Sequence, residues 1–131
     1  MQTFSSSPMQ RNAAKLRILV VEDNHDTREM VCELLRLLGH APHGVGNAEQ
    51  ALTEADRHAF DILFTDISLP GMSGIELAKN IVRDHPTLGI ILASGYQVDK
   101  EDVEDFDCET LVKPYDLEQL QSALRTAGKA E

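Results

Sequence analysis

The stretch Ile62–Gly74, which reads ILFTDISLPGMSG, decides the fold of this chain. It begins with a short apolar run and continues through Pro70 and Gly71, a pattern typical of a buried strand that ends in a turn. Asp66 lies where the apolar run stops. In an open parallel sheet, ligands bind beyond the carboxyl ends of the strands, so this carboxylate is placed for chemistry. On this stretch alone, Asp66 is explained equally well as a residue that begins the turn.

Four other segments have the composition of strands. The runs at 17–21 (RILVV) and 90–93 (IILA) lack polar alternation, which is typical of strands covered on both faces. A brief run at 111–112 ends at Lys113. The segment at 41–45 is included because an element has to connect the helices on either side of it.

Helices are expected between these strands. In four places Asp, Asn or Ser is followed three residues later by Glu or Gln, a capping-box pattern that marks a helix start. A short acidic segment after the fourth strand is expected to form a further helix. The predicted helices are 26–38, 47–59, 73–85, 98–106 and 116–124. In the first of them, the residues expected to face the sheet are Met30, Leu34 and Leu38, with Val31 and Leu35. Those expected to face water are Arg28, Glu29 and Arg36.

Strand and helix therefore alternate five times with short connections, which is the pattern of a parallel sheet with helices on both faces. The predicted fold class is α/β, a single doubly wound domain, and a length of 131 residues suits one such domain. The domain is expected to cover residues 15–127. Residues 1–14 are expected to form a disordered tail because they are largely polar, and 128–131 a short C-terminal tail.

The charge and cysteine content limit the function classes. Twenty-two acidic residues against twelve basic ones give a formal net charge of -10, which argues against binding to nucleic acid or to an anionic membrane. The chain has no transmembrane run, and its first residues lack the apolar core of a signal peptide, so a cytoplasmic location is expected. Cys32 and Cys108 have neither zinc-site nor CxxC spacing. The five histidines are expected at the surface or in loops rather than as metal ligands or phosphodonors.

Polar residues follow the predicted strands at Glu22 and Asp23, Asp66, Ser94 and Lys113. A parallel sheet brings the carboxyl ends of its strands to one edge, so these side chains are expected to converge. Three carboxylates repel one another unless a cation lies among them, and Mg²⁺ is the most natural hard cation for oxygen ligands. Mg²⁺ keeps positions open for phosphoryl oxygens, which a lysine and a serine can also bind. The group predicts a site for a phosphoryl group.

Two nucleotide-binding motifs are missing from the sequence, and this limits the reactions that the site could carry out. The sequence has no GxxxxGK[ST] loop and no GxGxxG turn, so it gives no support to nucleotide binding. The phosphoryl group must therefore arrive on another molecule. A carboxylate beside Mg²⁺ can act as the nucleophile and become an acyl phosphate, and Asp66 is the best-placed candidate.

Four ordered motifs carry a resemblance to a known family. The segments 20–24 (VVEDN), 65–74 (TDISLPGMSG), 93–96 (ASGY) and 112–115 (VKPY) resemble those of receiver domains of bacterial two-component response regulators. The resemblance covers the predicted domain and implies a flavodoxin-like sheet with strand order 2-1-3-4-5. The ASGY segment is also similar to receivers attached to hybrid histidine kinases.

The resemblance implies a metal site and a phosphoacceptor. Asp66 corresponds to the phosphoacceptor, and Asp23 and Asp66 correspond to direct ligands of Mg²⁺. Glu22 would act largely through metal-bound water, and Ser68 would supply its backbone carbonyl to the ion.

The resemblance also implies roles for the residues around the phosphoryl group, with one departure. Ser94 and Lys113 would each bind a phosphoryl oxygen. The family usually has an aromatic switch residue three positions before the lysine, coupled to the serine, and here that position is Thr110. Ser94 and Thr110 are thus the expected switch positions, with Tyr96 or Tyr115 as substitutes for the missing ring.

The predicted function is a signalling module that catalyses only its own phosphorylation and dephosphorylation. It would accept a phosphoryl group from a histidine kinase or a histidine phosphotransfer protein, change conformation and regulate a downstream protein target, as a monomer or weak dimer. One alternative is a magnesium-dependent phosphatase or phosphotransferase for small molecules, although the residues after Asp66 offer no general acid to a leaving alcohol. A second is an interaction domain that no longer turns over phosphate.

Overall fold

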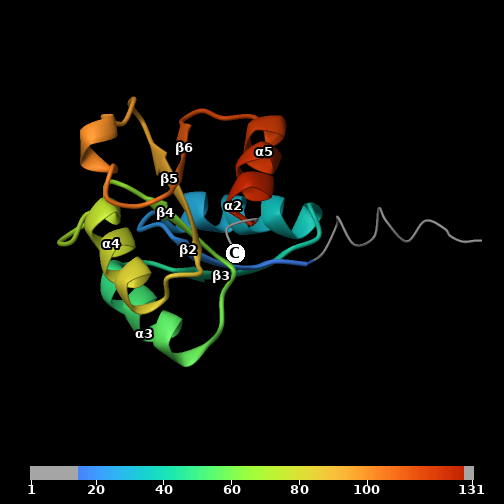
Figure 1. Cartoon of the computed structure of the whole chain (residues 1–131). Helices are drawn as coiled ribbons and strands as arrows, with labels where there is room; N and C mark the ends of the chain where they lie inside the picture. Colours follow the sequence, from blue (N-terminus) through green and yellow to red (C-terminus); the bar gives the residue numbers. More distant parts are fainter. Residues whose placement is uncertain (1–14, 129–131) are drawn as a thin grey trace, which may run out of the picture.

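Five parallel strands form one sheet in the computed structural model, which describes residues 15–128 (Figure 1). The strands are β2 (Arg17–Val21), β3 (Ala41–Val45), β4 (Ile62–Asp66), β5 (Gly89–Ser94) and β6 (Glu109–Val112). Their order is β3-β2-β4-β5-β6, which in chain order is 2-1-3-4-5 and confirms the predicted doubly wound sheet. The tail predicted at 1–14 and residues 129–131 of the C-terminal tail lie outside the described residues, whereas Gly128 forms the C-cap of the last helix.

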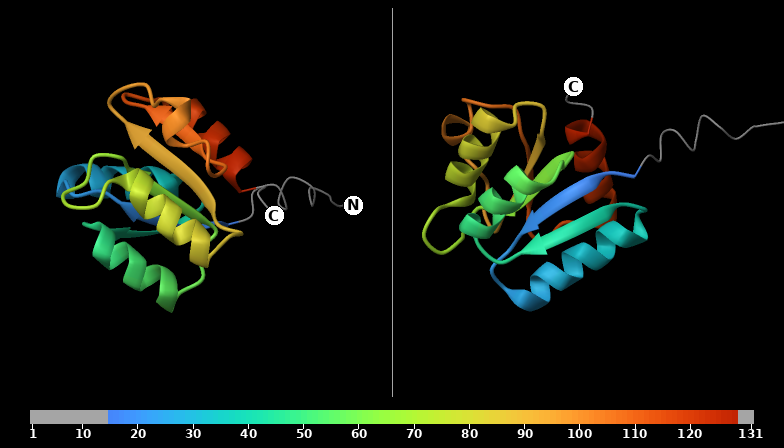
Figure 2. Two further views of the ribbon diagram at one scale, coloured as in Figure 1. Left: turned by 60° about the vertical axis from the view of Figure 1, so that its left-hand side comes forward. Right: turned by 90° about the horizontal axis from the view of Figure 1, so that it is seen from below.

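Four α-helices cover the sheet. They are α2 (His25–Leu37), α3 (Ala48–Arg57), α4 (Gly74–Asp84) and α5 (Leu117–Ala127). The side chains of Asn47, Ser73 and Asp116 cap their helices as predicted, each accepting a backbone N–H three residues on. The first helix begins earlier than predicted, because Asn24 rather than Asp26 caps it. Helices α2 and α5 lie on one face of the sheet, and α3 and α4 lie on the other (Figure 2).

The strands are buried on both faces, as their uninterrupted apolar sequence predicts. In β2, Ile18 and Val20 pack with α2 and α5, whereas Leu19 and Val21 pack with α3 and α4. All four side chains are fully buried. Two layers of apolar side chains therefore hold the sheet in place, so the polar residues at its carboxyl edge have fixed positions.

The helix predicted at 98–106 is wrong. This segment contains only a 3-10 turn, η1 (Lys100–Asp102), and Asp99 before it makes no capping hydrogen bond through its side chain. The segment is dense in acidic residues, and like charges three or four positions apart destabilise a helix. Val103 and Phe106 are nevertheless half-buried against the core.

The orientation predicted for the first helix is confirmed for Val31 and Leu35, which are buried, and is wrong for Met30 and Arg28. Met30 is 55% exposed, whereas Val31 and Cys32 are buried. Arg28 precedes those two residues by three and four positions, so it shares their face rather than the solvent face. Its guanidinium donates a hydrogen bond of 2.8 Å to the carbonyl oxygen of Glu22 and so ties α2 to the end of β2.

Gly74 sets how closely α4 approaches the end of β4. A Cβ atom on Gly74 would lie 2.1 Å from the carbonyl oxygen of Asp66. We therefore expect Gly74→Ala to lower the free energy of unfolding by about 2–3 kcal/mol in urea denaturation. Gly95→Ala is the matched control, because a Cβ atom there meets nothing within 4 Å. Equal stability of the two variants would show that α4 does not need this close contact.

His40 links stability to pH. Burial lowers the pKa of His40, and its Nδ1 accepts the backbone N–H of Leu16 at 3.1 Å, which requires a neutral ring nitrogen. Below the unfolded value of about 6.5, the unfolded chain binds this proton first, so stability falls as the pH drops through that value and the lower folded pKa. His40→Asn keeps an acceptor that does not titrate, and we expect it to reduce this loss in urea denaturation at about pH 7.5 and about pH 5.5. His25→Asn, an exposed change, should leave the loss as it is; an unaltered loss in His40→Asn would contradict the assignment.

Candidate functional site

Three carboxylates meet at the carboxyl edge of the sheet. Glu22 and Asp23 follow β2 and Asp66 ends β4, and these two strands are neighbours in the sheet. One oxygen atom from each residue lies within 4.8 Å of the others. Glu22 is buried, Asp66 is half-buried and Asp23 is exposed, so the group opens from the core toward solvent.

Lys113 lies directly beyond β6 and reaches across to this group. Its Nζ donates a hydrogen bond of 3.0 Å to Oδ2 of Asp66 and lies 3.7 Å from Oε1 of Glu22. One lysine therefore serves two carboxylates, and the group keeps an excess of negative charge. That excess, with three oxygen donors within reach of one another, fits a hard divalent cation such as Mg²⁺.

The Asp66 carboxylate is held on both oxygens. Oδ2 accepts the Lys113 ammonium, and Oδ1 accepts the backbone N–H of Ser68 at 3.1 Å. Because Ser68 begins the loop after β4, this hydrogen bond fixes the carboxylate against the turn that the sequence predicted. The predicted strand-end position and the alternative turn interaction of Asp66 are thus both present.

Burial is the main influence on Glu22. It raises the pKa of the Glu22 carboxyl, the backbone N–H of Asn24 lowers it, and the nearby Asp66 raises it again. The Asn24 N–H donates to Oε2 of Glu22 at 2.9 Å. Arg28 and the Asn24 N–H also position Glu22, and neither was predicted from the sequence. For Arg28, the available signal was its helical spacing from Val31 and Cys32.

Ser94 ends β5 beside the strand that carries Asp66. Asp66 pairs with Ala93 in the sheet, and the Ser94 side chain is almost fully buried. Its Oγ accepts the backbone N–H of Tyr96 at 3.1 Å, and its carbonyl oxygen accepts the backbone N–H of Lys113 at 2.7 Å. Ser94 therefore joins the ends of β5 and β6, as the strand-end pattern predicts.

Thr110 does not lie with the other predicted residues. It pairs with Leu92 inside the sheet, before the strand ends, and its side chain is exposed. Tyr115 is an aromatic residue close to the acidic group: burial, and then the charges of Glu22 and Asp66, raise the pKa of Tyr115 to about 12. Its ring packs edge-on against Phe64, with ring centroids 6.3 Å apart.

Comparison with known proteins identifies the family. Residues 18–125 match the response regulator receiver domain family. The chain is 31% identical over 107 residues to the response regulator receiver protein CpdR of Brucella abortus, an alignment that covers 79% of this chain and 89% of CpdR. It is 35% identical over 107 residues to the response regulator protein FleR of Pseudomonas aeruginosa, which covers 79% of this chain but only 23% of FleR.

A solved structure shows the same fold with a metal. The receiver domain of the sensor histidine kinase PA1611 from Pseudomonas aeruginosa has a magnesium ion coordinated in its active site cleft. It matches this chain with a TM-score of 0.74 and 28% identity, over 87% of this chain and 98% of that one. The fold, the match over most of the chain and the acidic group at the sheet edge agree, and the chain belongs to the response regulator receiver domains, the phosphoacceptor signalling domains of two-component systems.

Proposed function

We propose that Asp66 is the phosphoacceptor and that it takes the phosphoryl group from a phosphohistidine of a histidine kinase or histidine phosphotransfer protein. The observation that carries this proposal is the position of the carboxylate, which Lys113 and the Ser68 N–H hold at 3.0 and 3.1 Å. A carboxylate oxygen of Asp66 attacks phosphorus, the phosphorus–nitrogen bond breaks, and the imidazole leaves with the electron pair. Water later attacks the acyl phosphate, releases inorganic phosphate and restores the carboxylate.

Glu22, Asp23 and Asp66 fit a bound Mg²⁺, with the Ser68 carbonyl as a further ligand that the family resemblance implies. When bound, Mg²⁺ supplies positive charge that offsets the negative charge of the phosphoryl oxygens. Two facts support this assignment: the three carboxylates lie within 4.8 Å of one another, and the related PA1611 domain holds magnesium in its cleft.

We propose that Lys113 and Ser94 each bind an oxygen of the phosphoryl group. Lys113 already bridges Asp66 and Glu22, so its ammonium is in place to pair with an oxygen of the incoming group. Ser94 stands at the end of the adjacent strand and keeps its hydroxyl proton to donate. Both residues stabilise charge on the phosphoryl group, and neither supplies the nucleophile.

We propose that the phosphodonor protein binds to the surface formed by α2 and the strand-end loops. The phosphohistidine must approach in line with Asp66, and α2 begins directly after Glu22 and Asp23. On α2, Met30 and Leu37 are 55% and 76% exposed. These two side chains, seven positions apart on one helix face, offer an apolar contact for the partner.

We propose that Ser94 and Tyr115 transmit the effect of phosphorylation at Asp66. Thr110 occupies the usual aromatic position but has no ring, although it remains an exposed position on β6 that a partner can contact. Tyr115 follows Lys113 closely and already feels the charge of Asp66 and Glu22. A change of charge at Asp66 therefore changes the electrostatic surroundings of this aromatic side chain.

We assign the domain a reaction on its own Asp66 and interactions with protein partners, and no small-molecule substrate. No general acid follows Asp66, since the next residues are Ile67 and Ser68, so a leaving alcohol would lack a proton donor. None of the helices in residues 15–128 is long and apolar enough to cross a membrane. We assign it to the cytoplasm, as a monomer or weak dimer that acts on a downstream protein rather than on nucleic acid.

Acetyl phosphate provides the direct test of this function. With Mg²⁺, the chain should take up one phosphoryl group, measured by intact mass, and hydroxylamine should remove it because acyl phosphates are reactive toward that nucleophile. Addition of EDTA before acetyl phosphate should prevent the uptake. A domain that takes up no phosphate under these conditions, or takes it up equally with EDTA, would not fit the proposal.

A substitution of Asp23 tests the metal ligands separately. We expect Asp23→Asn to weaken Mg²⁺ binding by about tenfold or more, measured by calorimetric titration, because the ion loses one charged oxygen ligand. Asp26→Asn is the matched control: it removes the same charge three residues along, in the first turn of α2 and outside the acidic group. Equal affinities for the two variants would show that Mg²⁺ responds to overall charge and not to a ligand at Asp23.

A further inference from the structure

A groove of about 740 Å³ lies at the edge of the sheet opposite the acidic group. It is lined by the end of α4, the start of β5, the segment before β6 and the end of α5. Strand β5 runs from Gly89, which lines the groove, to Ser94 at the site. Six residues of strand separate the two places by roughly 16 Å, so the groove is distinct from the phosphoacceptor site.

The floor of the groove is apolar and partly exposed to solvent. Val82, Leu88 and Phe106 line it, and all three are half-buried while packing against the core. The segment 98–106, predicted as a helix, forms only the turn η1, and Phe106 at its end is half-buried. The floor can therefore take up apolar side chains of another molecule.

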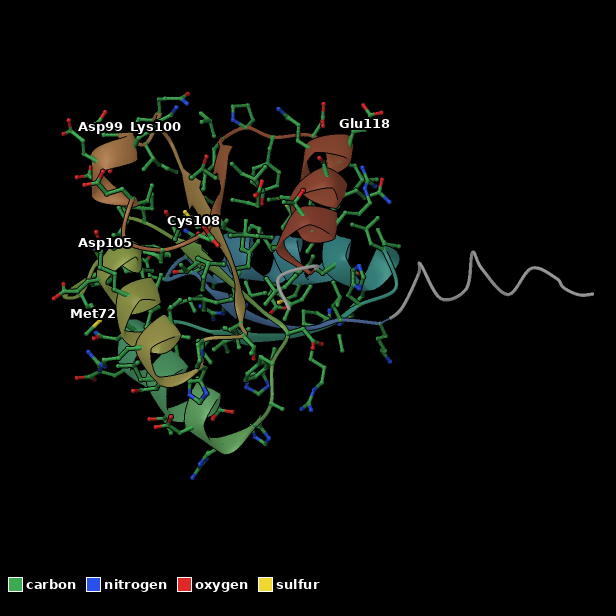
Figure 3. The ribbon with its side chains drawn as sticks, viewed as in Figure 1. Met72, Asp99, Lys100, Asp105, Cys108 and Glu118 are labelled. Atoms are coloured by element: carbon green, nitrogen blue, oxygen red, sulfur yellow. The ribbon has the colours of Figure 1, made fainter. Side chains whose placement is uncertain are left out.

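The rim of the groove is acidic. Asp105, Asp107 and Glu109 line it, and within residues 15–128 only Asp105 has an ion pair, with Lys79 at 3.3 Å. Cys108 lies between the other two acids, and burial, then the charges of Glu109 and Asp107, raise the pKa of its thiol. Figure 3 labels Asp105 and Cys108 on the segment that leads into β6.

We propose that this groove binds a basic amphipathic segment of a partner protein. Its apolar side chains would pack on Val82, Leu88 and Phe106, and its Lys or Arg side chains would pair with Asp107 and Glu109. The acidic side chains of the rim disfavour nucleic acid and anionic membranes, and a second copy of the chain carries the same net charge of -10. The inference does not depend on phosphorylation at Asp66, and a partner bound here leaves α2 free for the phosphodonor.

A synthetic helical peptide with leucines on one face and lysines on the other serves as the probe, and calorimetry of the full chain measures its binding. We expect Asp107→Asn/Glu109→Gln to weaken binding roughly fivefold at low salt, because two exposed ion pairs are lost. The matched control is Glu29→Gln/Glu33→Gln on the exposed surface of α2, which should weaken binding less than twofold. The peptide should also slow modification of the Cys108 thiol, with buried Cys32 as the internal reference.

The proposal would be overturned by equal loss of affinity in both double variants, or by equal binding of a leucine–glutamate peptide. It would also be overturned by a Cys108 reaction rate that does not change with the peptide, or by dimerisation that the Asp107→Asn/Glu109→Gln change alters. Phe106→Ala checks the floor and should also weaken binding, provided its circular dichroism spectrum matches that of the unaltered chain. If Arg11→Glu raised Cys108 reactivity without any peptide, the occupant would be the chain's own N-terminal segment, and the proposal would be wrong.

Discussion

Asp66→Asn will abolish the uptake of phosphate from acetyl phosphate. The amide has nearly the shape of the carboxylate and can still accept the Ser68 N–H, but its oxygen is a far weaker nucleophile. We expect no hydroxylamine-sensitive phosphate by intact mass, even at times when the unaltered chain is fully labelled. The fold should persist, since the substitution changes no apolar contact of β4.

A matched loss of charge elsewhere controls this result. Asp84→Asn removes an exposed carboxylate at the end of α4 and should be labelled at the rate of the unaltered chain. Labelling of Asp66→Asn at that same rate would mean that another residue accepts the phosphoryl group. The assignment of Asp66 would then be wrong, whatever the family.

Lys113→Met will slow phosphorylation without abolishing it. The substitution keeps much of the apolar stem and removes the ammonium that lies 3.0 Å from Asp66, so the transferring phosphoryl group loses one positive partner. Removal of one such preorganised donor costs about a hundredfold in rate or more in other enzymes, and we expect a loss of that order. Time courses of intact mass at fixed acetyl phosphate and Mg²⁺ measure it.

Lys79→Met distinguishes the role of Lys113 from a general effect of charge. Lys79 is exposed on α4, where it pairs with Asp105 and not with the acidic group. Its replacement should leave the rate within about twofold of the unaltered chain, because an exposed distant charge is screened. A Lys113→Met rate close to the Lys79→Met rate would remove Lys113 from the reaction.

The fold could be predicted because most of its signals are local. Capping residues such as Asn47 and Asp116 stand where helices begin, and uninterrupted apolar runs stand where strands are buried on both faces. Even the weak strand at 41–45 was predicted with the observed bounds, because the alternation of strands and helices along the chain required an element between two helices. The convergence of Glu22, Asp66 and Lys113 followed from parallel strands alone.

The incorrect predictions concern features that depend on tertiary packing or on like charges. The helical spacing of Arg28 from Val31 and Cys32 indicated the buried face of α2, but the prediction followed the rule that a charged residue is ordinarily assigned to solvent. The segment 98–106 has apolar residues at plausible intervals, yet its acidic side chains disfavour a helix. Tyr115 became informative only when the structure placed its ring beside Phe64 and within the field of the acidic group.

Identification of the phosphorylated residue tests the central claim most directly. The unaltered chain is labelled with acetyl phosphate and Mg²⁺, the acyl phosphate is reduced with borohydride to mark its carbonyl carbon, and the modified residue is located by peptide sequencing. The proposed site predicts a single modified position, Asp66. Modification at Glu22 or at Asp23, with Asp66 unmodified, would contradict it.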